Sequence, residues 1–227
     1  MEAYDDKDFV NSWLRRTGRF DVPKSCTASP STVEELTALL AKHALNLPIV
    51  AKPIRGRGSQ GVKVCHSMSE LEHHLYELGS NSILEEFLPG VEGTVTVMPP
   101  SRSRPKYRAM PLVERFNHAE GIAPYSGNVA VSVNSRVVKG GELIGRDDGA
   151  AVEEVMRQCE GVAELLGVAA PVRIDVRKGD EGVGKRYKIF DVNMKPVSSI
   201  RRSCKCLICW LTLIDTVELD HARSSWL

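Results

Sequence analysis

The sequence lacks the features of a membrane, secreted or nucleic-acid-binding protein. No apolar run approaches the roughly 20 residues that a membrane-spanning helix needs, and the acidic start, Met1–Phe9, has no apolar core of a signal peptide. The 30 basic and 29 acidic residues leave a net charge of +1, which gives no electrostatic reason for binding nucleic acid or a membrane surface. We therefore expect an intracellular, cytoplasmic protein with neither of these partners.

The chain has six cysteines, and their distribution does not suggest a disulfide framework. Three of the six lie singly in apolar elements, as reduced and buried thiols do: Cys26, Cys65 and Cys159. A second set could supply four zinc ligands near the C-terminus: Cys204, Cys206, Cys209 and His221. Its spacing matches no standard pattern of paired zinc knuckles, so a zinc-stabilised interaction module is the least favoured hypothesis.

The most informative stretch is Leu47–Val64, which reads LPIVAKPIRGRGSQGVKV. Apolar residues on both sides, at strand-like length, predict a strand, a glycine-rich loop and a second strand. Glycines let backbone amides approach an anion, and Lys52 before the loop adds a point charge for phosphate. The pattern predicts a phosphate-binding hairpin, with an ordinary hairpin and a glycine-containing turn as the alternative.

Two other glycine-loop architectures do not fit this stretch. A dinucleotide-binding fingerprint requires a helix directly after the glycines, whereas strand-type alternation resumes at Val62. A protein kinase carries its lysine after the loop, followed by catalytic-loop and D-F-G signatures. Here Lys52 precedes the loop and neither signature occurs.

Helices and antiparallel-type strands alternate along the chain, which indicates an α+β protein in two lobes. Ser31 with Glu34, and Ser67 with Glu70, form sequence patterns of capping boxes that open helices. His73 and His74 are adjacent on one predicted helix and face different sides, so we expect a solvated face rather than a metal site. Further helices are expected over 5–18 and from 147 or 148 to 167, and further strands over 82–88, 92–98, 107–116, 128–133, 171–177 and 187–193.

The last two predicted strands carry the residues best suited to chemistry. Side chains alternate along a strand, so Arg173 and Asp175 share one face, and Asp191 and Asn193 share one face of the next strand. If these strands pair, two carboxylates, an amide oxygen and a guanidinium meet on one surface. Hard oxygen ligands suit Mg²⁺ that bridges phosphates, and an arginine beside them can stabilise a transferring phosphoryl group. A solvated hairpin face with an ion pair is the alternative.

Three stretches together resemble the ATP-grasp ligases, most closely the D-alanine–D-alanine ligase-like group. They read IVAKPIRGRGSQGVKV, ILEEFLPGVEGTVTV, and RIDV followed by FDVNMKP, in the family's order and rough spacing. The resemblance covers residues 1–196 and implies two α+β lobes with antiparallel sheets and the nucleotide between them. The lobes would be 1–88, with the helices and the glycine-loop hairpin, and 89–196, with the metal-binding strands, followed by a divergent tail, 197–227.

The resemblance also implies roles for individual residues. ATP phosphates would be bound by Lys7, Lys52 and the loop residues Gly58, Ser59, Gln60 and Gly61. Adenine would meet a hinge strand, mostly through backbone groups of Glu85, Glu86, Phe87 and Leu88, with Glu92 on the ribose hydroxyls. Mg²⁺, or Mn²⁺ in its place, would be held by Asp175, Asp191 and Asn193, and Arg173 would be the catalytic residue that steadies the phosphoryl group. We expect Lys52, Glu92 and the metal ligands to line one cleft.

The activity implied is the ATP-dependent joining of a carboxylate to an amine through an acyl phosphate, as in D-alanine–D-alanine ligase activity. The expected partners are small carboxylate and amine substrates, with a homodimer left open. Three departures from the family pattern are expected to matter: no N-terminal domain precedes the ATP-binding part, Asp191 stands where glutamate is usual, and no glycine follows Pro196. A chain that binds Mg-ATP without ligase activity is therefore the main alternative.

Overall fold

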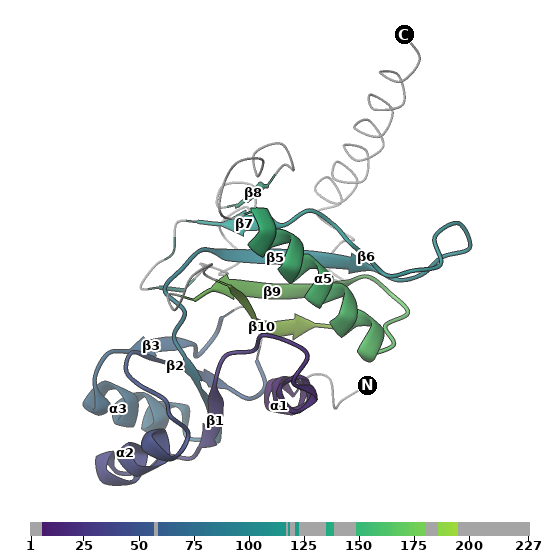
Figure 1. The fold of residues 1–227 in the computed structure, drawn as a ribbon. Coiled ribbons are helices and arrows are strands. Elements are labelled where there is room, and N and C mark those ends of the chain that lie inside the picture. Colours follow the sequence, from purple (N-terminus) through teal and green to yellow (C-terminus); the bar gives the residue numbers. More distant parts are fainter. Residues whose placement is uncertain are drawn as a thin grey trace. The chain divides into compact units, whose positions relative to one another are not determined.

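Two antiparallel sheets and the helices packed on them make up the described part of the chain (Figure 1). The computed structural model describes residues 6–56, 59–116, 118, 121–122, 135–138, 149–179 and 186–194, all within one unit that ends at Met194. The predicted strand 128–133, the loop residue Gly58 and the proposed zinc ligands of the tail lie outside these residues. No helix among the described residues is long and apolar enough to cross a membrane.

The first sheet has the strand order β1-β4-β2-β3 and is covered on one face by two helices (Figure 1). Its strands are β1 (Ser25–Ala28), β2 (Ile49–Pro53), β3 (Lys63–Cys65) and β4 (Ser82–Glu86), and its helices are α2 (Val33–Lys42) and α3 (Met68–Leu78). Helix residues spaced four apart, Leu36 with Leu40 and Leu71 with Leu75, point into the same core as Ile49. The glycine-rich loop joins β2 to β3, which pair as the predicted hairpin.

The capping residues of these helices match the prediction in one case and not in the other. α3 begins after Ser67, whose side chain accepts a hydrogen bond from the Glu70 amide, as predicted. α2 begins after Thr32, which forms a reciprocal capping box with Glu35, so the prediction of Ser31 and Glu34 was wrong by one residue.

The second sheet has the order β10-β9-β5-β7-β8, with β6 paired to β5. Its strands are β5 (Glu92–Met98), β6 (Arg108–Ala109), β7 (Val113–Arg115), β8 (Ser135–Val137), β9 (Val172–Lys178) and β10 (Tyr187–Asn193). Helix α5 (Gly149–Leu165) lies along this sheet and contacts β5, β6, β9 and β10 (Figure 1). Helix α1 (Lys7–Thr17) packs into the same core through Val10 and Leu14, although it precedes the first sheet in the sequence.

A bulge in β10 determines which side chains of that strand face away from the core. Ile189 and Val192 are both buried although they are three residues apart, because the register against β9 shifts between Ile189 and Asp191. Beyond the shift, Asp191 lies opposite Asp175, and Asn193 lies opposite Arg173. The pairing of the last two strands, expected from the sequence, is therefore confirmed.

We predict that Gly90→Ala destabilises the fold by about 1–3 kcal/mol, as overpacking of a close contact does. Gly90 lies between β4 and β5, and its amide donates to the Lys178 carbonyl at 3.0 Å. A Cβ at this position would lie 2.5 Å from that carbonyl oxygen and 2.7 Å from the Lys178 Cβ.

Urea unfolding measures the effect, and Gly179→Ala is the matched control. An added Cβ at Gly179 meets nothing nearer than 3.9 Å, so its free energy of unfolding should stay within about 0.5 kcal/mol of the wild type. Equal unfolding midpoints for the two variants would contradict the importance of the close approach at Gly90.

Candidate functional site

Three adjacent strands of the second sheet place their polar side chains on one face. In the register of β5 and β9, Thr94 lies opposite Asp175 and Glu92 lies opposite Arg177. Across β9 and β10, Asp175 lies opposite Asp191. Directly opposed residues point to the same side of a sheet, so these side chains form a continuous polar row. The intervening residues, including Val95 and Ile174, face the α5 core.

Asp175 is the centre of this row and accepts three side-chain hydrogen bonds. Thr94 Oγ1 donates to Asp175 Oδ1 at 2.8 Å, and Oδ2 receives Arg173 Nη2 at 3.1 Å and Asn193 Nδ2 at 3.0 Å. Burial raises the pKa of the Asp175 carboxyl, Arg173 counteracts it, and the nearby Asp191 carboxylate adds to it. Two carboxylates in such surroundings favour a bound cation.

The residues around the two carboxylates suit Mg²⁺. Asn193 Nδ2 lies 3.4 Å from Asp191 Oδ2, so one amide bridges both carboxylates, and a turn of this amide would present its oxygen instead. Within the described residues, no three or more His, Cys, Asp or Glu side chains form a group that could hold a metal. Two carboxylates and an amide form a small ligand set, which fits a magnesium ion that takes further oxygens from phosphates and water.

Lys7 contacts both the glycine-loop hairpin and β10. Its Nζ donates to the Gly56 carbonyl at 3.1 Å and lies 3.5 Å from Asp191 Oδ1. Asp6 accepts from the Phe9 amide as the N-cap of α1, which begins the helix at this lysine. The structure thus places the predicted Lys7 beside the predicted metal ligands.

The glycine loop is held at its far end by a histidine. Ser59 and Gly61 have positive φ angles of 57° and 73°, and a Cβ on Gly61 would lie 2.9 Å from Pro53 Cγ. His74 is buried, and its Nε2 lies 3.1 Å from the Gly61 carbonyl oxygen, so the expectation of a solvated His74 was wrong. His73 is solvated as expected, with 73% of its side chain exposed. Gln60 is exposed.

Lys52 forms a buried ion pair in the first sheet. Its Nζ lies 2.8 Å from Glu85 Oε1 and also donates to the Phe190 carbonyl at 3.3 Å. Burial raises the pKa of Glu85, and the Lys52 ammonium counteracts it. The adenine role predicted for Glu85 stays a prediction; in the structure its backbone pairs with both β1 and β2.

The other predicted hinge residues follow directly at the end of β4. The Glu86 carboxylate accepts hydrogen bonds from Lys188 Nζ at 2.7 and 2.9 Å. The Glu86 backbone amide donates to the Lys24 carbonyl. The Phe87 ring lies under the Arg177 guanidinium at 5.2 Å, and Leu88 is buried.

Glu92, the predicted ribose ligand, already contacts a histidine and an arginine. Its Oε2 lies 3.0 Å from His118 Nε2 and 3.6 Å from Arg177 Nη1. Arg177 also donates to the Gly90 and Gly121 carbonyls, and burial lowers its pKa. A ribose hydroxyl would share or replace these contacts.

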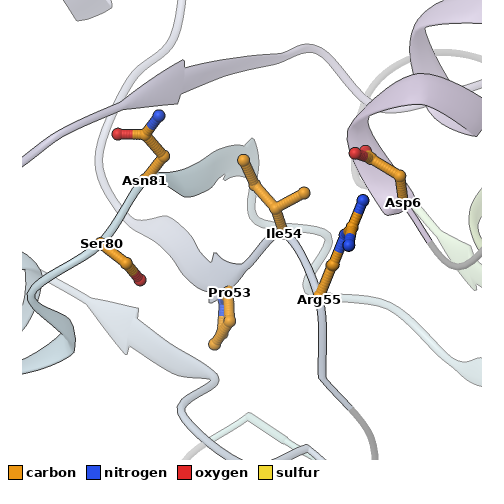
Figure 2. Close-up of a pocket in the computed structure, with 6 residues that line it drawn as sticks. All are labelled: Asp6, Pro53, Ile54, Arg55, Ser80 and Asn81. Atoms are coloured by element: carbon orange, nitrogen blue, oxygen red, sulfur yellow. The ribbon is translucent and has the colours of Figure 1, made fainter.

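An open pocket of about 390 Å³ lies at the base of the glycine hairpin. It is lined by Asp6, Pro53, Ile54, Arg55, Ser80 and Asn81, which include none of the predicted nucleotide or metal residues. In Figure 2 the Asp6 and Arg55 side chains lie at one end of the pocket and Asn81 and Ser80 at the other. The carboxylates of Asp175 and Asp191 therefore lie outside the lining of this pocket.

Sequence reasoning missed several residues that complete the site. Thr94 and Arg177 could have been found, since each lies two residues from a predicted site residue on the same strand. His118 and Asn11 carry no local pattern that marks them; they reach the site only through contacts distant in the sequence.

The sequence matches no family model and no curated protein. Solved structures do match. The chain is similar to the VanG D-Ala:D-Ser ligase from Enterococcus faecalis, with a TM-score of 0.63, 19% identity, and coverage of 86% of this chain and 53% of that chain. A second match is a D-alanine–D-alanine ligase from Bacillus anthracis complexed with ATP. Its TM-score is 0.56 and its identity is 20%, with coverage of 85% of this chain and 56% of that chain.

A third match is an ADP complex of purK, an N5-carboxyaminoimidazole ribonucleotide synthetase, with a TM-score of 0.61, 16% identity, and coverage of 87% and 46%. The chain has the α+β ATP-grasp fold expected from the sequence. It spans about half the length of each of these proteins.

We predict that Lys52→Met destabilises the fold by about 3–5 kcal/mol at neutral pH, because it leaves Glu85 buried without its counter-charge. Replacing both partners, in Lys52→Met with Glu85→Leu, should recover most of this loss. The exposed pair of Arg157 and Glu154 provides the control, and Arg157→Met should cost at most about 1 kcal/mol. Urea unfolding of these three variants, of Glu85→Leu alone and of the wild type tests the coupling, which additive losses in the double variant would contradict.

The free energy of unfolding that Lys52→Met loses should be larger at neutral pH than at acid pH. Burial raises the pKa of Glu85, and removal of Lys52 raises it further. Such a group favours folding below its unfolded pKa of about 4.3 and loses that contribution as the pH rises through the folded pKa. The stability deficit relative to wild type should therefore be largest at pH 7–8 and shrink toward pH 5. A deficit that is constant across this range would contradict the assignment.

Proposed function

We propose that this chain is an ATP-dependent ligase that joins a carboxylate to an amine through an acyl phosphate, in the manner of D-alanine–D-alanine ligases. The observation that supports it best is the facing pair of Asp175 and Asp191, with Asn193 bridging them and Lys7 and Arg173 beside them. Solved ligases with the same fold support the reaction class.

Asp175, Asp191 and Asn193 would hold Mg²⁺, and Mn²⁺ would suit the same oxygens. The bound ion would neutralise charge on the ATP phosphates. Asp175 keeps its orientation because Thr94 and Arg173 donate to its two oxygens. Asp191 is next to Lys7, which would add a second positive charge on the phosphate side.

Arg173 would act on the group that is transferred. Its guanidinium is anchored to Asp175, and 30% of its side chain is exposed, so it can meet a phosphoryl group at the surface of the polar row. Lys52 and the loop residues Ser59–Gly61 would bind phosphates, and Glu92 the ribose. We also propose that the lobes divide near residue 88, between β4 and β5, with the nucleotide between them. The chain would act by positioning and charge neutralisation rather than by a covalent enzyme intermediate.

Two measurements test this proposal in sequence. Calorimetric titration with ATP, with and without Mg²⁺, should show binding that depends on the metal. Phosphate release is then measured with D-alanine, D-serine, other amino acids and hydroxy acids. Amine-dependent release supports the ligase, metal-dependent binding without release supports the nucleotide-binding alternative, and absence of binding would refute both.

We predict that Asp191→Asn weakens Mg-ATP binding by about tenfold or more, which corresponds to about 1.4 kcal/mol. The change removes one hard anionic ligand and leaves the side-chain shape nearly unchanged. Calorimetry gives the dissociation constant, and circular dichroism checks the fold. Glu154→Gln, an exposed carboxylate on α5, is the control and should bind as the wild type does. An unchanged Mg²⁺-dependent affinity in Asp191→Asn would refute the metal assignment.

A further inference from the structure

Asn11 and Lys52 donate hydrogen bonds to the same two acceptors. Lys52 Nζ reaches Glu85 Oε1 at 2.8 Å and the Phe190 carbonyl at 3.3 Å. Asn11 Nδ2 reaches Glu85 Oε2 at 3.5 Å and the same carbonyl at 3.2 Å. The four groups close into a ring with two donors and two acceptors, which we call the Asn11 ring.

The Asn11 ring is buried and joins four elements that are distant in the sequence. The three side chains have exposed fractions of 1% for Asn11, 4% for Lys52 and 3% for Glu85. They come from α1, β2 and β4, and the Phe190 carbonyl comes from β10. A buried ring of this kind fixes the relative position of its members, because any displacement leaves a polar group without a partner.

Phe190 connects the ring to the part of β10 that carries Asp191. It is the residue at the register shift of β10, directly before Asp191. Its carbonyl accepts from both ring donors, so the ring restrains the backbone that carries Asp191. Lys52 and Asp191 are thus held by one set of hydrogen bonds.

Helix α1 contributes both Asn11 of the ring and Lys7, which contacts Asp191. Lys7 and Asn11 are four residues apart, so they lie on one face of the helix. Lys7 contacts the Gly56 carbonyl and Asp191, and Asn11 contacts Glu85 and Phe190 one turn later. The same face of α1 therefore contacts the glycine hairpin and β10.

We propose that Asn11 is a positioning residue for nucleotide binding, which holds the Lys52 ammonium and, through Phe190, the Asp191 backbone in one geometry. This rests on the proposed function only in assigning Lys52 and Asp191 to Mg-ATP. Asn11 itself acts through these two residues. Without its amide, Glu85 and the Phe190 carbonyl each lose one donor, and the Lys52 ammonium is restrained less firmly.

The test compares Asn11→Leu, which has a similar volume and no donor, with Asn11→Gln, which keeps the amide. Ser12→Ala is the control on the same helix, because Ser12 bonds to Asp8 and not to the ring. Thermal unfolding checks that each variant folds, and Asn11→Ala, which also lacks a donor, replaces Asn11→Leu if the latter does not fold. Two readouts are taken: the dissociation constant of Mg-ATP, and the rate at which acetic anhydride modifies Lys52 without nucleotide, relative to the exposed Lys42, by peptide mass spectrometry.

We expect Asn11→Leu to weaken Mg-ATP binding about tenfold and to raise the relative acetylation of Lys52 severalfold. Asn11→Gln should restore much of both, and Ser12→Ala should change neither. Unchanged acetylation of Lys52 in Asn11→Leu would overturn the proposal, and so would equal losses in Asn11→Leu and Asn11→Gln, which indicate packing alone. If the wild type does not bind Mg-ATP, the proposed function fails, whereas the acetylation rates still decide whether Asn11 positions Lys52.

Discussion

A buried charge needs a partner, and this requirement shapes the described part of the chain more than any other. Lys52 and Glu85 are buried in the first sheet and form an ion pair, and Asp175 accepts hydrogen bonds from donors on three strands. The apolar faces could pack in several ways, since hydrophobic contact is not directional. The charge pairs add direction, because each is satisfied only when particular strands lie side by side.

The parts that could be predicted from the sequence are those set by short-range periodicity. Alternation along β9 and β10 placed Arg173 with Asp175 and Asp191 with Asn193, and the observed register puts the two pairs opposite each other. The error of one residue at α2 also has a local origin. Ser31 and Thr32 are each followed three residues later by a glutamate, so the sequence offers two overlapping capping boxes.

The parts that could not be predicted depend on contacts between distant residues. The bulge at Phe190 has no proline or glycine to mark it and shows only in the shifted pairing with β9. His74 looked like half of an exposed histidine pair, but its contact is with the loop at Gly61. Asn11 is an ordinary polar residue on an amphipathic helix until three other elements surround it.

The short connection between the two sheets sets a limit on movement. β4 ends at Glu86 and β5 begins at Glu92, so the segment Phe87–Val91 is all that separates them along the chain. Even fully extended, it lets the Cα atoms of Glu86 and Glu92 move at most about 20 Å apart. The Gly90 amide is also bonded to Lys178, which ties this tether to the second sheet. Any opening of the sheets would therefore have to leave Glu86 and Glu92 within this distance of each other.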